Sequence, residues 1–181
     1  MWEPNAVVAI YATHVDVALA VKDLQRAGID MRTLSIVAKD SHTNEHVVGY
    51  YTTGDRIDRM KYWGKTGAFW GGFWGLLLGS GFFAIPGLGP VLVAGPLVAW
   101  IVAGLEGAAA VGGVSAIGAG LISKGLPMDS VVQYELALKA DKFLLMVHGT
   151  ALEVEKARSI ITTTRPIDVT LHAPETVGAA R

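Results

Sequence analysis

A long stretch almost without charge constrains this chain more than any other feature. Between Lys65 and Lys124 lie 58 residues that contain one charged side chain, Glu106, and 17 of the 22 glycines fall between Gly64 and Gly125. A helix that crosses a bilayer needs about 20 largely apolar residues. The stretch is long enough for two such helices, which are predicted at residues 66–84 and 97–123.

The turn between these two helices is predicted from proline and glycine. Pro lacks the backbone N–H that a helix needs, and Gly favours turns. Basic residues lie on both flanks, which under the positive-inside rule places both ends of a membrane hairpin, and both termini, at the cytoplasmic side of a bacterial membrane. The alternative is a hairpin buried in the core of an oligomer. The turn residues are Pro86, Gly87, Gly89 and Pro90.

Small residues recur every four positions in both predicted helices, so that they line one helical face. Such a glycine-zipper surface lets two backbones approach closely, which is how helices associate in a bilayer. We therefore expect tight helix packing and a homo-oligomer. The residues are Gly67, Gly71, Gly75 and Gly79 in the first helix and Ala108, Gly112, Ala116 and Gly120 in the second.

Glu106 is the candidate intramembrane acid. An ionisable group at membrane depth costs a few kcal/mol, and it is by default a functional candidate. The alternative is that Glu106 lies near a helix end or a subunit junction, where it is neutral or hydrogen-bonded.

The flanking segments contain two β-α-β units. The first has strands at 7–11 and 31–38 around a helix that a capping box, Thr13 to Asp16, begins. The second has strands at 143–147 and 167–171 around a helix that Thr150 and Glu153 begin, and another helix is expected at 129–141. Two such units form a ferredoxin-like fold. The predicted class is α+β, a four-stranded antiparallel sheet interrupted by the apolar helical hairpin.

The expected organisation follows from this pattern. Residues 1–64 hold the first half of the ferredoxin-like domain and a juxtamembrane segment, 65–124 the transmembrane hairpin, 125–172 the second half, and 173–181 a disordered tail.

The chain resembles a bacterial stress-protein family. The order β-α-β, then the glycine- and tryptophan-rich run at 67–79, the Ile-Pro-Gly-Leu-Gly-Pro motif from Ile85 and a Gly-Leu-Pro before a helix are similar to general-stress-protein 17M-type domains and heat-induced stress membrane proteins. The resemblance covers residues 6 to 163, and the motif at 85–97 is its most specific part. It implies a bacterial stress or envelope role and supplies no catalytic residues.

Composition and motifs argue against chemistry. A net charge of −1 gives no basic excess for nucleic acid, and the chain has no Cys. His42 and His46 fall in a predicted polar turn, which is a far commoner explanation of this pattern than a metal site. No nucleotide or catalytic motif is present, so neither an enzyme nor a cofactor is expected.

The predicted function is that of a membrane-embedded, homo-oligomeric scaffold with a stress or envelope role. Its expected partners are the lipid bilayer and further copies of the chain, with another protein subunit as an alternative partner. One alternative is a pore or transport protein whose hairpins line a channel near Glu106. Another is a membrane anchor that recruits a soluble partner.

Overall fold

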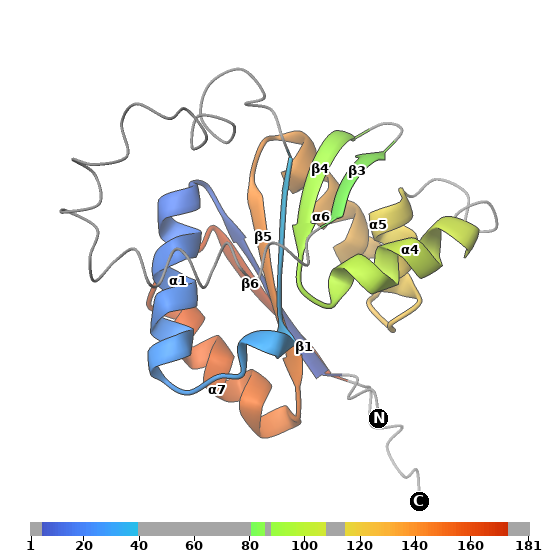
Figure 1. Cartoon of the computed structure of the whole chain (residues 1–181). Helices are drawn as coiled ribbons and strands as arrows, with labels where there is room; N and C mark the ends of the chain where they lie inside the picture. Colours follow the sequence, from blue (N-terminus) through green and yellow to red (C-terminus); the bar gives the residue numbers. More distant parts are fainter. Residues whose placement is uncertain (1–4, 40–80, 86–87, 108–114, 174–181) are drawn as a thin grey trace, which may run out of the picture.

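The computed structural model describes residues 5–39, 81–85, 88–107 and 115–173 (Figure 1). In chain order the elements are β1 (Asn5–Tyr11), α1 (His14–Arg26), the 3₁₀-helix η1 (Met31–Thr33), β2 (Leu34–Lys39), β3 (Gly81–Ile85), β4 (Gly89–Ala94), α4 (Leu97–Gly107), α5 (Ala116–Ile122), α6 (Met128–Lys139), β5 (Phe143–Gly149), α7 (Ala151–Thr162) and β6 (Asp168–His172).

The strands form one six-stranded sheet in the order β3-β4-β2-β5-β1-β6, and every pair of neighbours is antiparallel. The centre of the sheet joins the two ends of the chain, since Ala9 of β1 lies opposite Leu145 of β5 on one side and Val169 of β6 on the other. The mixed helix-and-sheet class is confirmed. The predicted number of four strands is wrong, because β3 and β4 extend the sheet beyond β2.

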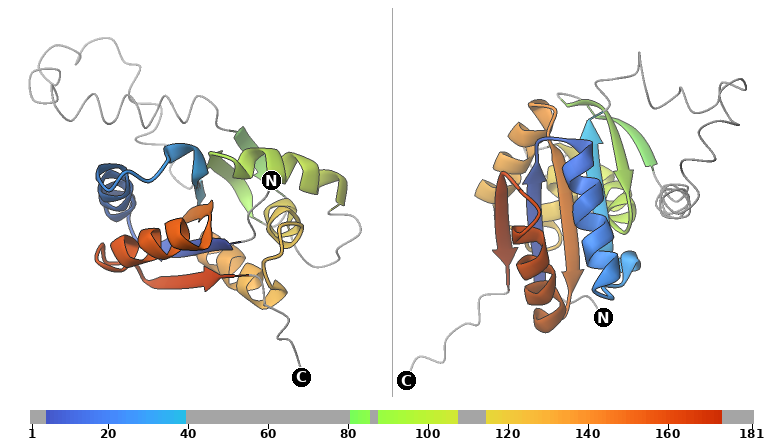
Figure 2. Two further views of the ribbon diagram at one scale, coloured as in Figure 1. Left: turned by 90° about the horizontal axis from the view of Figure 1, so that it is seen from below. Right: turned by 90° about the vertical axis from the view of Figure 1, so that its left-hand side faces the viewer.

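Helices cover both faces of the sheet (Figure 2). Val7, Ala9 and Tyr11 of β1 pack in a core with α1 and α7, whereas the alternate residues, such as Val8 and Ile10, pack in a second core with α4, α5 and α6. Every residue of β1 is therefore buried, as expected of a strand that is covered on both sides.

Capping residues begin two of the helices where the sequence predicted. Thr13 Oγ1 accepts a hydrogen bond from the backbone N–H of Asp16 at 3.2 Å. At α7 the box is reciprocal, because Thr150 Oγ1 accepts from the N–H of Glu153 at 3.3 Å and Glu153 Oε2 accepts from the N–H of Thr150 at 2.9 Å. These pairs fix the first turn of the two helices that cover one face of the sheet.

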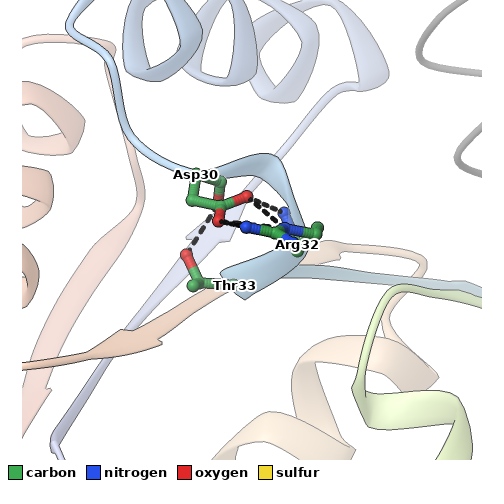
Figure 3. Close-up of polar contacts among 3 residues, drawn as sticks. All are labelled: Asp30, Arg32 and Thr33. Atoms are coloured by element: carbon green, nitrogen blue, oxygen red, sulfur yellow. Dashed lines mark hydrogen bonds and ion pairs between the residues drawn. The ribbon is translucent and has the colours of Figure 1, made fainter.

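The strand predicted to begin at residue 31 begins at Leu34 instead. Asp30 caps a 3₁₀ turn there, since its carboxylate accepts from the backbone N–H of Arg32 at 2.9 Å and from the Arg32 guanidinium at 2.7 Å (Figure 3). These hydrogen bonds from Arg32 lower the pKa of Asp30 to about 2. Thr33 Oγ1 donates to the Asp30 carbonyl at 2.7 Å, so the turn is held directly before β2.

The prediction of a first membrane helix at 66–84 is wrong at its end, because residues 81–84 lie in β3. β3 and β4 form a β-hairpin, in which Gly89 has φ +86° and pairs with Ile85. β4 then pairs with β2, with Val93 opposite Val37. The apolar run after Gly81 therefore continues the sheet, where a helix was expected; residues 66–80 lie outside the described residues.

The prediction of one continuous helix at 97–123 is also wrong. Ser115 has an extended backbone (φ −74°, ψ 173°) and caps α5, which is thus a helix separate from α4. Leu97 and Ile101 of α4 and Ile117 of α5 are buried in the core with the sheet. These three apolar side chains therefore pack in one core with the sheet of the same chain.

Within the described parts of the chain, no helix combines the length and the apolar character that crossing a membrane requires.

Candidate interaction surface

The structure places only some of the predicted site residues. Eight of them lie outside the described residues: Gly67, Gly71, Gly75, Gly79, Pro86, Gly87, Ala108 and Gly112. Gly89 and Pro90 begin β4, and Ala116 and Gly120 lie in α5. The backbone of Glu106 lies in the last turn of α4, next to the final residue, Gly107. His42 and His46 are also outside the described residues.

Gly120 lies at the closest approach of α4 and α5. A Cβ added to Gly120 would lie 2.9 Å from the carbonyl oxygen of Trp100 in α4, which is nearer than such atoms can pack. The Trp100 indole packs edge-on against His148 with ring centroids 5.4 Å apart, and Lys124 Nζ lies 5.5 Å from its ring centre. This small residue therefore brings together two helices within one chain.

A buried carboxylate joins α6 to α5. Glu135 Oε1 accepts from the backbone N–H of Ser115 at 2.7 Å and from Ser115 Oγ at 2.5 Å. Glu135 is only 7% exposed, and its negative charge lies at the N-terminus of a helix, where it is favourable. Sequence analysis did not single out Glu135; its role is to fix the two helices to each other.

The last strand, β6, forms one margin of the sheet (Figure 2, right). Among the described strands it pairs with β1 alone. Leu171 in this strand is 41% exposed, and Ile167 directly before it is 56% exposed. An edge strand presents a row of backbone N–H and C=O groups to any chain that can add a strand. β6 therefore combines backbone that can pair with exposed apolar side chains.

Polar contacts hold the side chains on the α6 side of this strand. Tyr134 Oη of α6 lies 2.6 Å from His172 Nε2 of β6, and both side chains are buried. Two residues away, Thr170 Oγ1 donates to Asp168 Oδ2 at 2.9 Å. Burial raises the pKa of Tyr134 to about 12 and lowers the pKa of His172. Both groups are therefore neutral near pH 7, and the Tyr134–His172 contact connects the end of the strand to α6.

A second exposed apolar area lies on α6. Met128, Val132 and Leu136 recur every four residues, so that they line one outer face of the helix, and they are 45%, 41% and 58% exposed. The spacing could have been recognised in the sequence, where this helix was described only as amphipathic. β6 and this stripe are two regions where the described surface exposes apolar side chains in an ordered pattern; Val15 and Leu19 of α1, four residues apart and 54% and 50% exposed, form a third.

Buried polar pairs connect elements of the described fold. The described residues contain no group of three or more His, Asp or Glu side chains that could hold a metal ion. The buried polar side chains described above pair with one another: Tyr134 with His172, Glu135 with Ser115, and Tyr11 Oη with Thr164 Oγ1 at 2.7 Å.

Residues 6–84 match the family model of the heat induced stress protein YflT domain. The matched part runs from β1 into β3 and is less than half of the chain. It supports a stress-protein relationship for this part, whereas the motif at 85–97, on which the resemblance of the sequence depended most, lies beyond it. No curated protein and no solved structure matches the chain.

Proposed function

We propose that the chain is a non-enzymatic stress-response protein that acts as a self-assembling structural component. The observation that carries this proposal is the edge strand β6, whose outer side has no partner strand among the described residues and whose margin exposes Ile167 and Leu171. Because helices cover both faces of the sheet, assembly can continue the sheet only at its edges. The match of residues 6–84 to a heat induced stress protein domain supports the stress context.

A self-assembling chain accounts for the exposed apolar side chains at this edge better than a monomeric chain does. Edge strands in monomeric proteins commonly carry Lys or Pro, which discourage pairing with another chain. The five residues of β6, Asp-Val-Thr-Leu-His, contain neither. Their one exposed charge, Asp168, lies at the beginning of the strand, so the centre of the strand carries no charge that would oppose another strand.

The test is the mass of the purified full-length chain in the absence of lipid. Light scattering after size exclusion, at concentrations between about 1 and 100 µM, should give a dimer or a larger defined assembly. A chain that remains monomeric throughout this range contradicts the proposal. Heating the sample in steps below the unfolding temperature tests whether assembly responds to the stress that the family match suggests.

Membrane attachment is a second candidate function, favoured by the sequence at residues 66–80, where 15 consecutive residues carry no charge and include Phe69, Trp70, Phe73 and Trp74. Flotation with vesicles of phosphatidylethanolamine and phosphatidylglycerol tests this candidate. Integral attachment predicts co-flotation that resists high salt and alkaline carbonate. Assembly without flotation favours the structural component alone.

A further inference from the structure

We propose that two copies of the chain pair their β6 strands antiparallel about a two-fold axis at Thr170, which places Asp168 of each copy opposite His172 of the other. This inference rests on the proposed self-assembly and specifies its contact. The resulting dimer has one continuous sheet, with β1 and β6 of each copy at its centre.

The sequence of β6 is complementary to itself in this register. In an antiparallel pair centred on residue 170, position 168 faces 172, 169 faces 171 and 170 faces its own copy. Asp168 then meets His172, Val169 meets Leu171, and Thr170 meets Thr170. Acidic–imidazole, apolar–apolar and Thr–Thr pairs are each favourable across strands. A two-fold interface must be complementary to itself in this way.

The polar pairs and the apolar pair lie on opposite faces of the sheet. Side chains alternate along a strand, so Asp168, Thr170 and His172 lie on the α6 side, where Tyr134 contacts His172. Val169 and Leu171 lie opposite Ala9 and Val7 of β1, whose side chains pack with α1 and α7. The apolar pair therefore continues one core of the molecule across the interface, and the polar pairs lie on the other face.

The polar partners are already ordered within one copy. His172 Nε2 is engaged by Tyr134 Oη at 2.6 Å, which leaves Nδ1 as the ring nitrogen for the partner's carboxylate. Thr170 Oγ1 holds Asp168 Oδ2 at 2.9 Å, and Asp168 is exposed, so the carboxylate can be reached. Ordering before contact reduces the entropy that association costs.

Competing pairings fit less well. A shift of the register by two residues would place Asp168 opposite Thr170 and leave His172 beyond the paired strand. A shift by one residue would no longer centre the pair on a residue, and Asp168 would face Leu171. Only the arrangement centred on Thr170 pairs all five residues of β6.

A single-cysteine variant provides the direct test, because the chain has no Cys of its own. Residues directly opposite in an antiparallel pair have Cα atoms about 4.5–5.5 Å apart, which suits a disulfide. Thr170→Cys should therefore form a covalent dimer almost completely under mild oxidation. Thr162→Cys, which replaces an exposed Thr at the end of α7, is the matched control and should crosslink at least tenfold more slowly.

Charge placed on the strand provides the second test. Leu171→Lys should raise the dimer dissociation constant at least tenfold, whereas Leu19→Lys, at a leucine of α1 that is 50% exposed and lies away from β6, should leave it unchanged. Unfolding curves of both variants show whether the fold is kept. A wild-type chain that is monomeric overturns both the proposed function and this contact. A wild-type dimer that Leu171→Lys does not weaken, or in which Thr170→Cys crosslinks no faster than the control, overturns the β6 contact alone.

Discussion

Replacing Gly95 by alanine should destabilise the fold more than the same change at the other described glycines with positive φ, Gly28, Gly89 and Gly125. Gly95 lies between β4 and α4 with φ +88°, and a Cβ there would lie 2.1 Å from the carbonyl oxygen of Leu34 and 2.9 Å from Cα of Ser35. Both atoms belong to the backbone of β2, which is paired on both sides, so neither can move without disturbing the sheet. At Gly95 the connection between β4 and α4 therefore packs directly against the backbone of β2.

The magnitude follows from two separate costs. A left-handed backbone conformation costs an alanine about 1–2 kcal/mol, of which the stiffer unfolded chain returns about 0.4–1 kcal/mol. Forcing extra atoms into packed structure costs about a further 1–3 kcal/mol or more. The neighbouring hydrogen bond from the Leu97 N–H to Ser35 Oγ, 3.2 Å long, would also be strained. We expect Gly95→Ala to lower the free energy of unfolding by about 2–4 kcal/mol.

Gly125→Ala is the matched control. Gly125 has φ +87°, yet nothing lies within 4 Å of the added Cβ, so this variant carries only the backbone cost of about 1 kcal/mol. Urea unfolding followed by circular dichroism gives both values. Equal losses for the two variants would refute the reasoning, because they would show that Gly95 is not seated against β2. Such a result would also favour the predicted hairpin, in which the helix at 97–123 does not pack on the sheet.

Three further predictions concern buried polar groups. Thr164→Val should cost about 1–3 kcal/mol because it leaves the Tyr11 hydroxyl buried without its 2.7 Å partner, whereas Thr163→Val on the surface should cost little; urea unfolding measures both. Burial raises the pKa of Tyr11 and of Tyr134 to about 12, so stability is complete below pH 10 and should fall by about 3 kcal/mol per tyrosine as the pH rises to 12; phenylalanine at either position should flatten the measured profile, and an unchanged profile would contradict the prediction. Burial lowers the pKa of His172, so the contribution of this histidine to the free energy of unfolding is complete above about pH 6.5 and is lost as the pH falls. His172→Asn should therefore make the fall of the free energy of unfolding below pH 6.5 shallower by up to about 1.4 kcal/mol per pH unit. An unaltered slope would count against this prediction.

The elements at the two ends of the chain could be predicted because their signals are local. Thr13 and Thr150 begin their helices through side-chain hydrogen bonds to residues three positions later. Strands β1 and β5 are short apolar runs bounded by polar residues, and both were expected within two residues of their ends. None of these features needs knowledge of what lies across the sheet.

The middle of the chain could not be predicted in this way. Short apolar runs such as 82–85 and 91–94 suit a buried helix and a buried strand equally. The second run becomes a strand by pairing with β2, about 55 residues earlier, and the first by pairing with the second. Helices at 97–107 and 116–122 are apolar enough for a bilayer and also for the underside of a sheet. The signal that favours the sheet is β1 itself, whose run Val7-Val8-Ala9-Ile10 has no polar residue for an exposed face.

The candidate interaction surface was harder still to predict. Asp168 is an ordinary residue of the strand predicted at 167–171, and His172 directly follows it, until the strand is known to lie at the margin of the sheet. Tyr134 becomes relevant only when α6 is found above β6, 38 residues away in the sequence. Edges and long-range contacts are properties of the assembled sheet, and the local pattern of residues does not encode them separately.

The position of β1 between β5 and β6 also determines when the molecule can fold during its synthesis. The first strand leaves the ribosome at once, but its partner residues in β5 follow more than 130 residues later, and those of β6 later again. At about 5–20 residues per second this delay is on the order of ten seconds. Throughout that interval a strand with apolar side chains on both faces is exposed without its neighbours. We therefore expect the nascent chain to need a chaperone, and more of it as temperature rises, because β1 lacks its central neighbour β5 until residue 149 has been made.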